Sequence, residues 1–259
     1  MPRLHEQEAR ALGLDYSYQL FDLERRNASV AALPSLLAEA QQQGFAGLNI
    51  THPCKQAVIP LLDELSAEAA AIGAVNTVVF RRGKRIGYNT DAPGFAASFQ
   101  RELSDVSIRN VILLGAGGAG SAIAVASSQQ GQLGIERLAI YDTDHARAAA
   151  LAERVGAAAV NDLAQSMPEA DGVIQATPIG MASHPGAPLP LALLQPKHWV
   201  AEIIYFPLET ELLRHAHALG CRTMDGGGMA VFQAAKAFQL FTDIAPDTER
   251  MLRHFAALD

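Results

Sequence analysis

A glycine-rich loop near the middle of the chain has the spacing that binds the phosphates of a nucleotide. The sequence VILLGAGGAG from Val111 places Gly115, Gly117 and Gly120 in a GxGxxG pattern, with Gly118 and Ala119 between the last two. Between a strand and a helix, the first glycine permits a tight turn, the second lets the backbone approach a pyrophosphate, and the third lets helix and strand pack closely. The loop therefore predicts a dinucleotide site at the start of a helix.

An acidic residue completes this pattern. Asp142 lies ~20 residues beyond the loop at the end of the next apolar run, where a carboxylate accepts hydrogen bonds from a ribose diol. With Asp144 two residues later, the pocket favours NAD over NADP, because a 2'-phosphate would meet like charge. Arg147 is the cation that could neutralise the phosphate, but Asp144 can hold it by an i, i+3 ion pair. From these residues alone, S-adenosylmethionine in a methyltransferase is an alternative ligand.

Three polar clusters each follow a strand-like apolar run: Asn49 to Lys55, Asn76-Thr77 and Asn89 to Asp91. Open parallel sheets place ligands at the carboxyl ends of their strands. Oxidation of an alcohol needs a group that takes the hydroxyl proton as hydride leaves, and Lys55 with the Asp91 carboxylate can do so. The structural alternative makes Lys55 a solvated residue of a first helical turn and Asp91 the N-cap of a helix that begins near Pro93.

Hydrophobic periodicity indicates the elements that position these residues. In the first part we expect helices at 4–14, 30–43, 53–65 and 93–103, strands at 16–23 and 45–51, and a hairpin of 74–80 with 85–90. This alternation predicts a mostly parallel sheet. Beyond a boundary near residue 105 we expect strands at 111–114, 138–141, 172–175 and 199–205, and helices at 118–129, 146–155, 210–219 and 229–240. The second set is a doubly wound pattern.

Composition limits the function further. The 259 residues are 49% hydrophobic and 18% charged, which is typical of a globular protein with two domains. The net charge of −7 argues against nucleic-acid binding, and the basic run Arg81 to Arg85 is interpreted as a solvated hairpin turn around Gly83. Cys54 and Cys221 are in no disulfide or zinc spacing, and no run is apolar enough for a signal peptide or membrane span. We expect a cytoplasmic protein with no membrane or metal partner.

Taken together, six motifs resemble the shikimate/quinate dehydrogenase family. They occur in the family's order over nearly the whole chain: GLNITHPCK (47–55), GAVNT (73–77), YNTD (88–91), GAGGAG (115–120), ATPIGM (176–181) and MAVFQ (229–233). The resemblance implies an α/β protein with an N-terminal substrate-binding α/β domain and a C-terminal doubly wound Rossmann domain. It assigns 1–104 to the substrate-binding and catalytic domain, with the C-terminal helix 229–259 returning to it, and 105–228 to the dinucleotide domain. The resemblance also argues against a methyltransferase.

By the same resemblance, Lys55 and Asp91 look like the catalytic pair. Residues similar to those that hold the substrate hydroxyls and carboxylate are Thr51, Asn76 and Gln233. Positions that resemble those around the nicotinamide are Thr177, Pro178, Met181, Tyr205 and Gly228. The structural alternative, which is less favoured, makes Pro178 only a loop residue and Met181 only a core filler. His52 points faintly toward the branch that uses quinate.

The expected reaction interconverts shikimate or quinate with the 3-dehydro ketone, with NAD as cofactor and NADP less favoured, in a monomer or homodimer with a cleft between its domains. Alternatives are a dehydrogenase of amino analogues, or a catalytically silent homologue that binds the dinucleotide. The silent form is considered because the family opens with a strand and a serine-rich turn that grips the carboxylate, ahead of a stretch like Pro2 to His5. The sequence starts inside that stretch, so its start is either cut or misassigned, or a strand is lacking.

Overall fold

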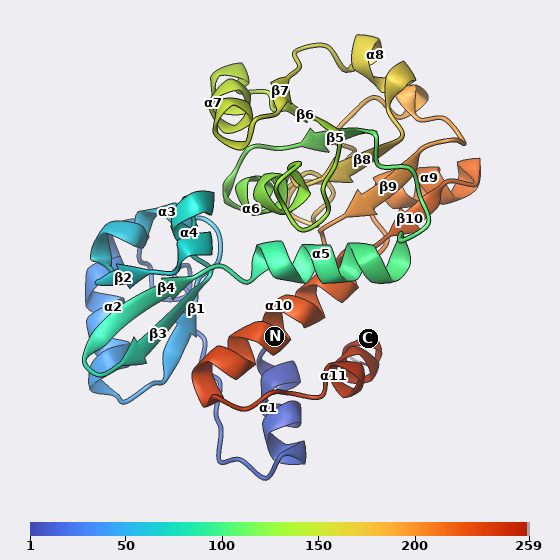
Figure 1. Ribbon diagram of the computed structural model, residues 1–259. Coiled ribbons are helices and arrows are strands. Elements are labelled where there is room, and N and C mark those ends of the chain that lie inside the picture. The colour runs from blue at the N-terminus through green and yellow to red at the C-terminus, as the bar shows by residue number, and fades with distance from the viewer. Residues whose placement is uncertain (258–259) are drawn as a thin grey trace. The chain divides into compact units, whose positions relative to one another are not determined.

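The computed structural model describes residues 1–257 and separates into two compact units (Figure 1). Unit 1 comprises residues 1–90 together with the chain from Val231 onward, and unit 2 comprises residues 91–230. Each unit combines helices with its own sheet. No helix among residues 1–257 is both long and apolar enough to cross a membrane. The division of substrate and cofactor binding between 1–104 and 105–228 stays a prediction.

Unit 2 contains a six-stranded, entirely parallel sheet in the order β10-β9-β8-β5-β6-β7. Its strands are β5 (Asn110–Leu114), β6 (Arg137–Tyr141), β7 (Ala158–Ala159), β8 (Gly172–Gln175), β9 (Trp199–Glu202) and β10 (Arg222–Met224). The chain runs outward from β5 to β7 and then returns to continue on the other side with β8. The order of the strands therefore reverses between β5 and β8, the position at which open sheets of this kind bind ligands.

Both faces of this sheet are buried, as the continuous apolar strands require. Along β5, Val111 and Leu113 pack with one hydrophobic cluster, whereas Ile112 and Leu114 pack with the other. The first cluster includes residues of α5 (Asp91–Glu102), α6 (Gly118–Ser127) and α7 (His145–Val155). The second includes residues of α8 (Leu163–Ser166), α9 (Glu211–Leu219) and the 3₁₀ turn Met167–Glu169, with the turn Leu191–Leu193 packed against it.

The sheet of unit 1 is mixed, so the expectation of a mostly parallel sheet in the first part is wrong there. Its order is β1-β3-β4-β2, with strands β1 (Gly47–Asn49), β2 (Glu64–Leu65), β3 (Thr77–Arg81) and β4 (Lys84–Tyr88). Only the β2–β4 pair is parallel. The hairpin was predicted correctly: β3 and β4 are joined by Arg82 and Gly83, with φ angles of 52° and 78°. Two left-handed residues are what a tight two-residue hairpin loop needs.

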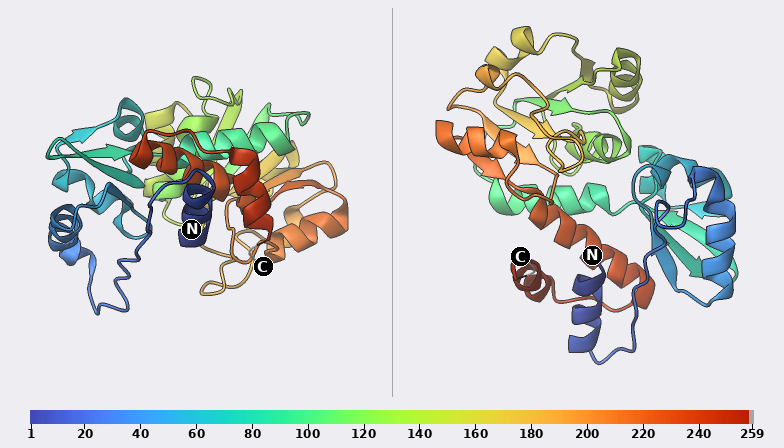
Figure 2. Two further views of the ribbon diagram at one scale, coloured as in Figure 1. Left: turned by 90° about the horizontal axis from the view of Figure 1, so that it is seen from below. Right: turned by 180° about the vertical axis from the view of Figure 1, so that it is seen from behind.

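The helices of unit 1 are α1 (Pro2–Ala11), α2 (Leu33–Gln42), α3 (Cys54–Ala57), α4 (Ala67–Ile72), α11 (Thr248–Ala256) and the part of α10 (Gly226–Thr242) from Val231 onward. Short 3₁₀ turns at Val30–Ala32 and Ile59–Leu61 precede α2 and follow α3. Leu4 of α1, Val231 of α10 and Met251 of α11 are fully buried in one cluster. Figures 1 and 2 accordingly show α1 and α11 beside the C-terminal part of α10.

Two of the predicted elements of unit 1 are wrong. The helix expected at 53–65 ends at Ala57, because Pro60 has no amide hydrogen for a helical bond, and Glu64–Leu65 instead pairs with β4. The strand expected at 16–23 is an irregular connection (Figure 2). Its alternating pattern fits an extended chain, but a strand also needs a ladder partner, and Tyr18 N donates instead to the Glu6 side chain at 3.0 Å.

A buried ion pair joins the two terminal helices of unit 1. The side chain of Glu8 is fully buried and accepts from Arg250 Nε at 2.8 Å, from Arg250 Nη2 at 2.6 Å and from Asp247 N at 2.8 Å. Three charge-assisted bonds offset the cost of burying this carboxylate. Removal of the arginine would leave the buried charge with one backbone donor.

We therefore predict that Arg250→Ala lowers the free energy of unfolding by about 3 kcal/mol. The matched control is Arg25→Ala, whose arginine pairs with Asp22 at 3.5 Å with 83% of its side chain exposed, and whose loss should cost less than about 1 kcal/mol. Urea denaturation followed by circular dichroism measures both. Equal effects of the two substitutions would show that the Glu8 pair does not hold the terminal helices.

Candidate active site

The glycine loop of unit 2 connects β5 to α6, and two of its glycines are required by the protein itself. Gly115 has a φ of 101°, in the left-handed region that favours glycine, and its N–H donates to Tyr141 O at 2.8 Å. A Cβ on Gly120 would lie 2.0 Å from Gly115 O, so the helix can approach the turn only because Gly120 has no side chain. Gly118 and Ala119 lie in the first turn of α6.

Gly117 differs from these two glycines. Its φ of −76° is open to any residue, and a Cβ there would meet no protein atom within 4 Å. It is the N-cap of α6 and makes no side-chain capping bond, and the first backbone N–H groups of a helix have no partner within the helix. Nothing within the protein explains a glycine here, whereas the close approach of a pyrophosphate does. The loop therefore fits a dinucleotide.

Asp142 lies at the end of β6 beside this loop, as predicted. Its Oδ2 accepts from Ala116 N at 2.7 Å and its Oδ1 accepts from Asp144 N at 2.9 Å. These bonds fix the carboxylate while each oxygen keeps acceptor capacity for a ribose hydroxyl. Arg147 is paired with Asp144, Nη2 to Oδ2 at 3.3 Å, as the spacing suggested.

The loops that follow β8 and β9 carry four more predicted cofactor positions, and Gly228 lies in the first turn of α10. Pro178, Met181 and Tyr205 are exposed, Met181 by 41% and Tyr205 by 42%, so Met181 is not a core filler. Thr177 lies against the glycine loop, because a Cβ on Gly115 would be 3.0 Å from Thr177 Cγ2. Gly228 has a packing reason of its own, since a Cβ there would lie 2.3 Å from Ser98 Oγ in α5.

Two buried residues that the sequence analysis missed hold these loops. Gln175 ends β8 and Glu202 ends β9, and neither is exposed. Burial raises the pKa of Glu202 to about 8, although hydrogen bonds from Ile204 N, Thr210 Oγ1 and Ile203 N oppose the shift. The available signal was a polar residue that ends an otherwise apolar strand, in GVIQ and WVAE.

In unit 1 the predicted substrate residues lie around Asn76, which is 4% exposed. Asn76 Nδ2 donates to Thr90 Oγ1 at 2.9 Å and to Gln233 Oε1 at 3.3 Å, and Asn76 Oδ1 accepts from Thr90 N at 2.8 Å and from Thr77 Oγ1 at 3.0 Å. The structure thus brings Gln233, from α10, to Asn76 over a large sequence separation. Among the described residues the Gln233 NH₂ group has no hydrogen-bond partner, which leaves two donors for a ligand.

Backbone bonds place Thr51 and Lys55 next to this amide centre. Ile50 N donates to Asn76 O at 2.7 Å, and Val75 N donates to Lys55 O at 2.8 Å. Thr51 is exposed and Lys55 half-buried. Asp91 is 1% exposed and begins α5, the first residue of unit 2 and the one directly after Thr90.

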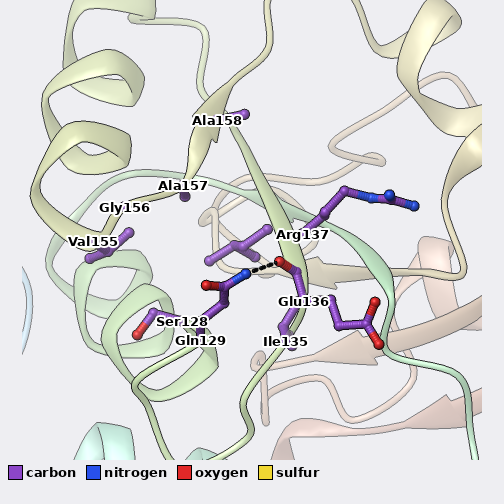
Figure 3. A pocket seen from close by; sticks show the side chains of 10 residues that line it. Ser128, Gln129, Ile135, Glu136, Arg137, Val155, Gly156, Ala157 and Ala158 are labelled. Atoms are coloured by element: carbon purple, nitrogen blue, oxygen red, sulfur yellow. Dashed lines mark hydrogen bonds between the residues drawn. The ribbon is translucent and has the colours of Figure 1, made fainter.

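A hollow of about 200 Å³ lies in unit 2 near the start of β6 (Figure 3). It is lined by Ser128, Gln129, Arg137 and Gly156 among others, and Gln129 Nε2 donates to Glu136 O across it at 2.6 Å. Arg137 begins β6, whereas the glycine loop and Asp142 lie at carboxyl ends. The hollow is therefore not part of the dinucleotide site.

Comparison with known proteins bears on both units. Residues 1–78 match the shikimate dehydrogenase substrate binding domain, and residues 226–254 match the shikimate 5'-dehydrogenase C-terminal domain. A shikimate dehydrogenase (NADP(+)) of Streptomyces avermitilis is 53% identical over 99% of this chain and 90% of its own. A quinate/shikimate dehydrogenase (NAD(+)) of Corynebacterium efficiens is 45% identical over 99% of this chain and 93% of its own.

Among solved structures, quinate dehydrogenase from Corynebacterium glutamicum in complex with NAD has a TM-score of 0.87 and 43% identity, covering 99% of this chain and 94% of that one. Fold and site thus define an oxidoreductase that acts on CH–OH groups with a nicotinamide dinucleotide. The chain belongs to the shikimate/quinate dehydrogenase family, as its motifs predicted. The predicted fold class, a substrate-binding α/β domain with a C-terminal Rossmann domain, is confirmed by the same likeness.

The contrast between two glycines gives a test of the dinucleotide loop. Gly117→Ala should leave the melting temperature nearly unchanged and weaken NADH binding at least about tenfold, because its methyl enters only the ligand's space. Gly120→Ala should lower the melting temperature and also weaken NADH binding, with a loss of stability of about 1–3 kcal/mol, because its methyl meets Gly115 O. Thermal melts and NADH fluorescence titrations measure the two effects. Normal NADH binding by Gly117→Ala would exclude this loop as the pyrophosphate site.

Proposed function

We propose that the protein is an NAD-dependent dehydrogenase that interconverts shikimate or quinate with the corresponding 3-dehydro ketone. The observation that carries this proposal is the amide centre of Asn76 and Gln233 in unit 1, which suits a polyhydroxylated acid. The NH₂ group of Gln233 offers two donors, and its Oε1, which accepts from Asn76 Nδ2, keeps one acceptor position, and hydroxyl groups need both donors and acceptors. Names of the relatives support the same substrate class.

In this proposal three side chains form the substrate site. Asn76 is fixed by Thr77 and Thr90, so its Nδ2 holds the amide of Gln233 in one orientation. The NH₂ group of Gln233 and the exposed hydroxyl of Thr51 then bind ring hydroxyls or the carboxylate. A binding site that is ordered before the substrate arrives loses less conformational entropy on binding.

Lys55 and Asp91 move the proton. During oxidation the Lys55 amine takes the proton of the reacting hydroxyl, and in reduction it returns that proton to the ketone oxygen. Asp91 positions Lys55 or the hydroxyl. The bound nicotinamide supplies the hydride acceptor or donor. Family resemblance supports these roles, together with the place of Lys55 beside Val75 and of Asp91 directly after Thr90.

NAD is proposed over NADP on the residues around the adenosine ribose. The fixed carboxylate of Asp142 suits a diol, and the Asp144 pair keeps Arg147 engaged. The relatives' names include both NADP and NAD, so the proposal is based on this chain's own charges. Both cysteines are buried as free thiols, which fits a reducing cytoplasm.

Replacement of the proposed proton carrier tests the mechanism. Lys55→Ala should fold normally and lose on the order of 10² to 10⁴ in kcat/KM, the usual contribution of a positioned acid or base. Lys236→Ala is the matched control in the same unit, because that lysine is exposed and bonds only to Gln239 at 3.3 Å. Turnover by Lys55→Ala above a tenth of the wild-type rate would remove Lys55 from the chemistry.

A cofactor and substrate screen tests the function as a whole. Reduction of NAD and of NADP is followed by absorbance with shikimate, quinate and an amino analogue in turn. We expect kcat/KM to be about ten- to thirtyfold higher with NAD, since about 1.4 to 2 kcal/mol of repulsion at Asp142 suffices. Equal values, or a preference for NADP, would show that Asp142 is not the ribose acceptor, and turnover of none of the three substrates would refute the proposed reaction.

A further inference from the structure

Gln175 and Glu202 are neighbours in the sheet of unit 2. They are register partners of the parallel pair β8–β9, each is the last residue of its strand, and both are completely buried. The residues before them in each strand are apolar and also buried. Burial of two polar groups side by side is costly unless each finds partners for its hydrogen bonds.

The amide of Gln175 is bonded entirely to the loop that follows β8. Its Oε1 accepts from Thr177 N at 2.9 Å, and its Nε2 donates to Thr177 O at 3.2 Å and to Ile179 O at 2.6 Å. The loop closes further when Ile179 N donates to Thr177 Oγ1 at 3.1 Å. One side chain therefore sets the backbone of Thr177, Pro178 and Ile179.

The carboxyl group of Glu202 does the same for the loop that follows β9. Its Oε1 accepts from Ile203 N at 2.9 Å and from Ile204 N at 3.0 Å, and its Oε2 accepts from Thr210 Oγ1 at 3.1 Å. Thr210 Oγ1 also caps α9 by accepting from Leu213 N. The start and the end of the loop that carries Tyr205 are thus tied to one buried group.

The two loops are packed against each other and against the glycine loop. A Cβ on Gly180 would lie 3.1 Å from Ile204 Cδ1 and 3.3 Å from Thr210 Cγ2, and Gly180 has a φ of 115°. On the other side, a Cβ on Gly115 would lie 2.9 Å from Ala176 O. A shift of either loop would therefore disturb its neighbour.

We infer that Gln175 and Glu202 are positioning residues that fix the two loops for the nicotinamide end of the dinucleotide. The inference rests on the proposed function, because it takes Thr177, Met181 and Tyr205 as the residues beside that ring. Apolar side chains at both positions would fill the same space without buried polar groups, but the backbone groups of the two loops would lose their hydrogen-bond partners. A misplacement of a reacting ring by about 1 Å can cost on the order of 10²-fold in rate.

The test compares two ligands that differ only at the nicotinamide end. NADH carries the ring, whereas ADP-ribose keeps the adenosine, the pyrophosphate and the second ribose without it. Gln175→Leu should weaken NADH binding about tenfold or more, leave ADP-ribose binding within about twofold, and lower kcat with little change in the substrate KM at saturating dinucleotide. If NADPH proves the better ligand of the wild-type protein, it replaces NADH and the 2'-phosphate form replaces ADP-ribose.

The matched control is His198→Leu. His198 is 1% exposed, lies just before β9 at the amino end, accepts from Gln195 N at 3.1 Å and bonds to Met167 O at 3.1 Å. His198→Leu removes two buried hydrogen bonds and should lower the melting temperature. It should not change NADH affinity relative to ADP-ribose affinity. Thr210→Val is a second variant, which removes the bond to Glu202 and the side-chain cap of α9. It should weaken NADH binding about threefold, so the test holds even if Gln175→Leu does not fold.

The inference is overturned if folded Gln175→Leu or Thr210→Val binds NADH with the affinity of the wild type, or if either variant loses affinity for NADH and ADP-ribose to the same extent. It is also overturned if His198→Leu weakens NADH binding more than ADP-ribose binding. Failure of the proposed function looks different. The wild-type protein would then bind neither dinucleotide, or it would bind one and turn over no substrate. That failure is seen in the wild-type protein alone and needs no measurement on the variants.

Discussion

The close approach of α6 to the turn after β5 is the constraint on which the dinucleotide site depends. A Cβ on Gly120 would overlap Gly115 O, so only a glycine at this position lets the first turn of the helix lie against the turn after the strand. The helix thus begins, without a side-chain cap, beside the open space at Gly117. It also brings Ala116 N to Asp142, so the glycine loop is bonded to the carboxylate that we propose as the ribose acceptor. A looser helix would lose both features together.

The candidate site of unit 1 depends on a buried amide, the side chain of Asn76. Asn76 bonds to residues of its own strand region, of the segment before α5 and of α10, so four bonds at one side chain connect distant parts of the sequence. A buried amide of this kind costs stability whenever a partner is missing. The arrangement therefore ties the proposed substrate site to correct folding of the segments that surround it.

The sequence predicted the parts of the protein whose signal is local. The strands of unit 2 are short apolar runs between helical patterns, and β8 was placed at its exact bounds because Gly172 and Gln175 flank it clearly. The helix at 53–65 failed although Pro60 was a local signal that the helix would end. The strand at 16–23 failed because strand pairing depends on partners that a local pattern does not contain. Gln175 and Glu202 were missed for a similar reason, since their importance lies in the loops they bind.

The Asp144–Arg147 pair has an evolutionary consequence. Both side chains are about half exposed, 48% and 57%, so the pair contributes only about 0.2–0.5 kcal/mol. A cation that suits a 2'-phosphate is thus already present one turn into α7 and is held back by a weak interaction. A lineage that changed its dinucleotide would need to release this arginine rather than acquire one. A short mutational path of this kind fits a family in which relatives of similar identity carry different dinucleotides in their names.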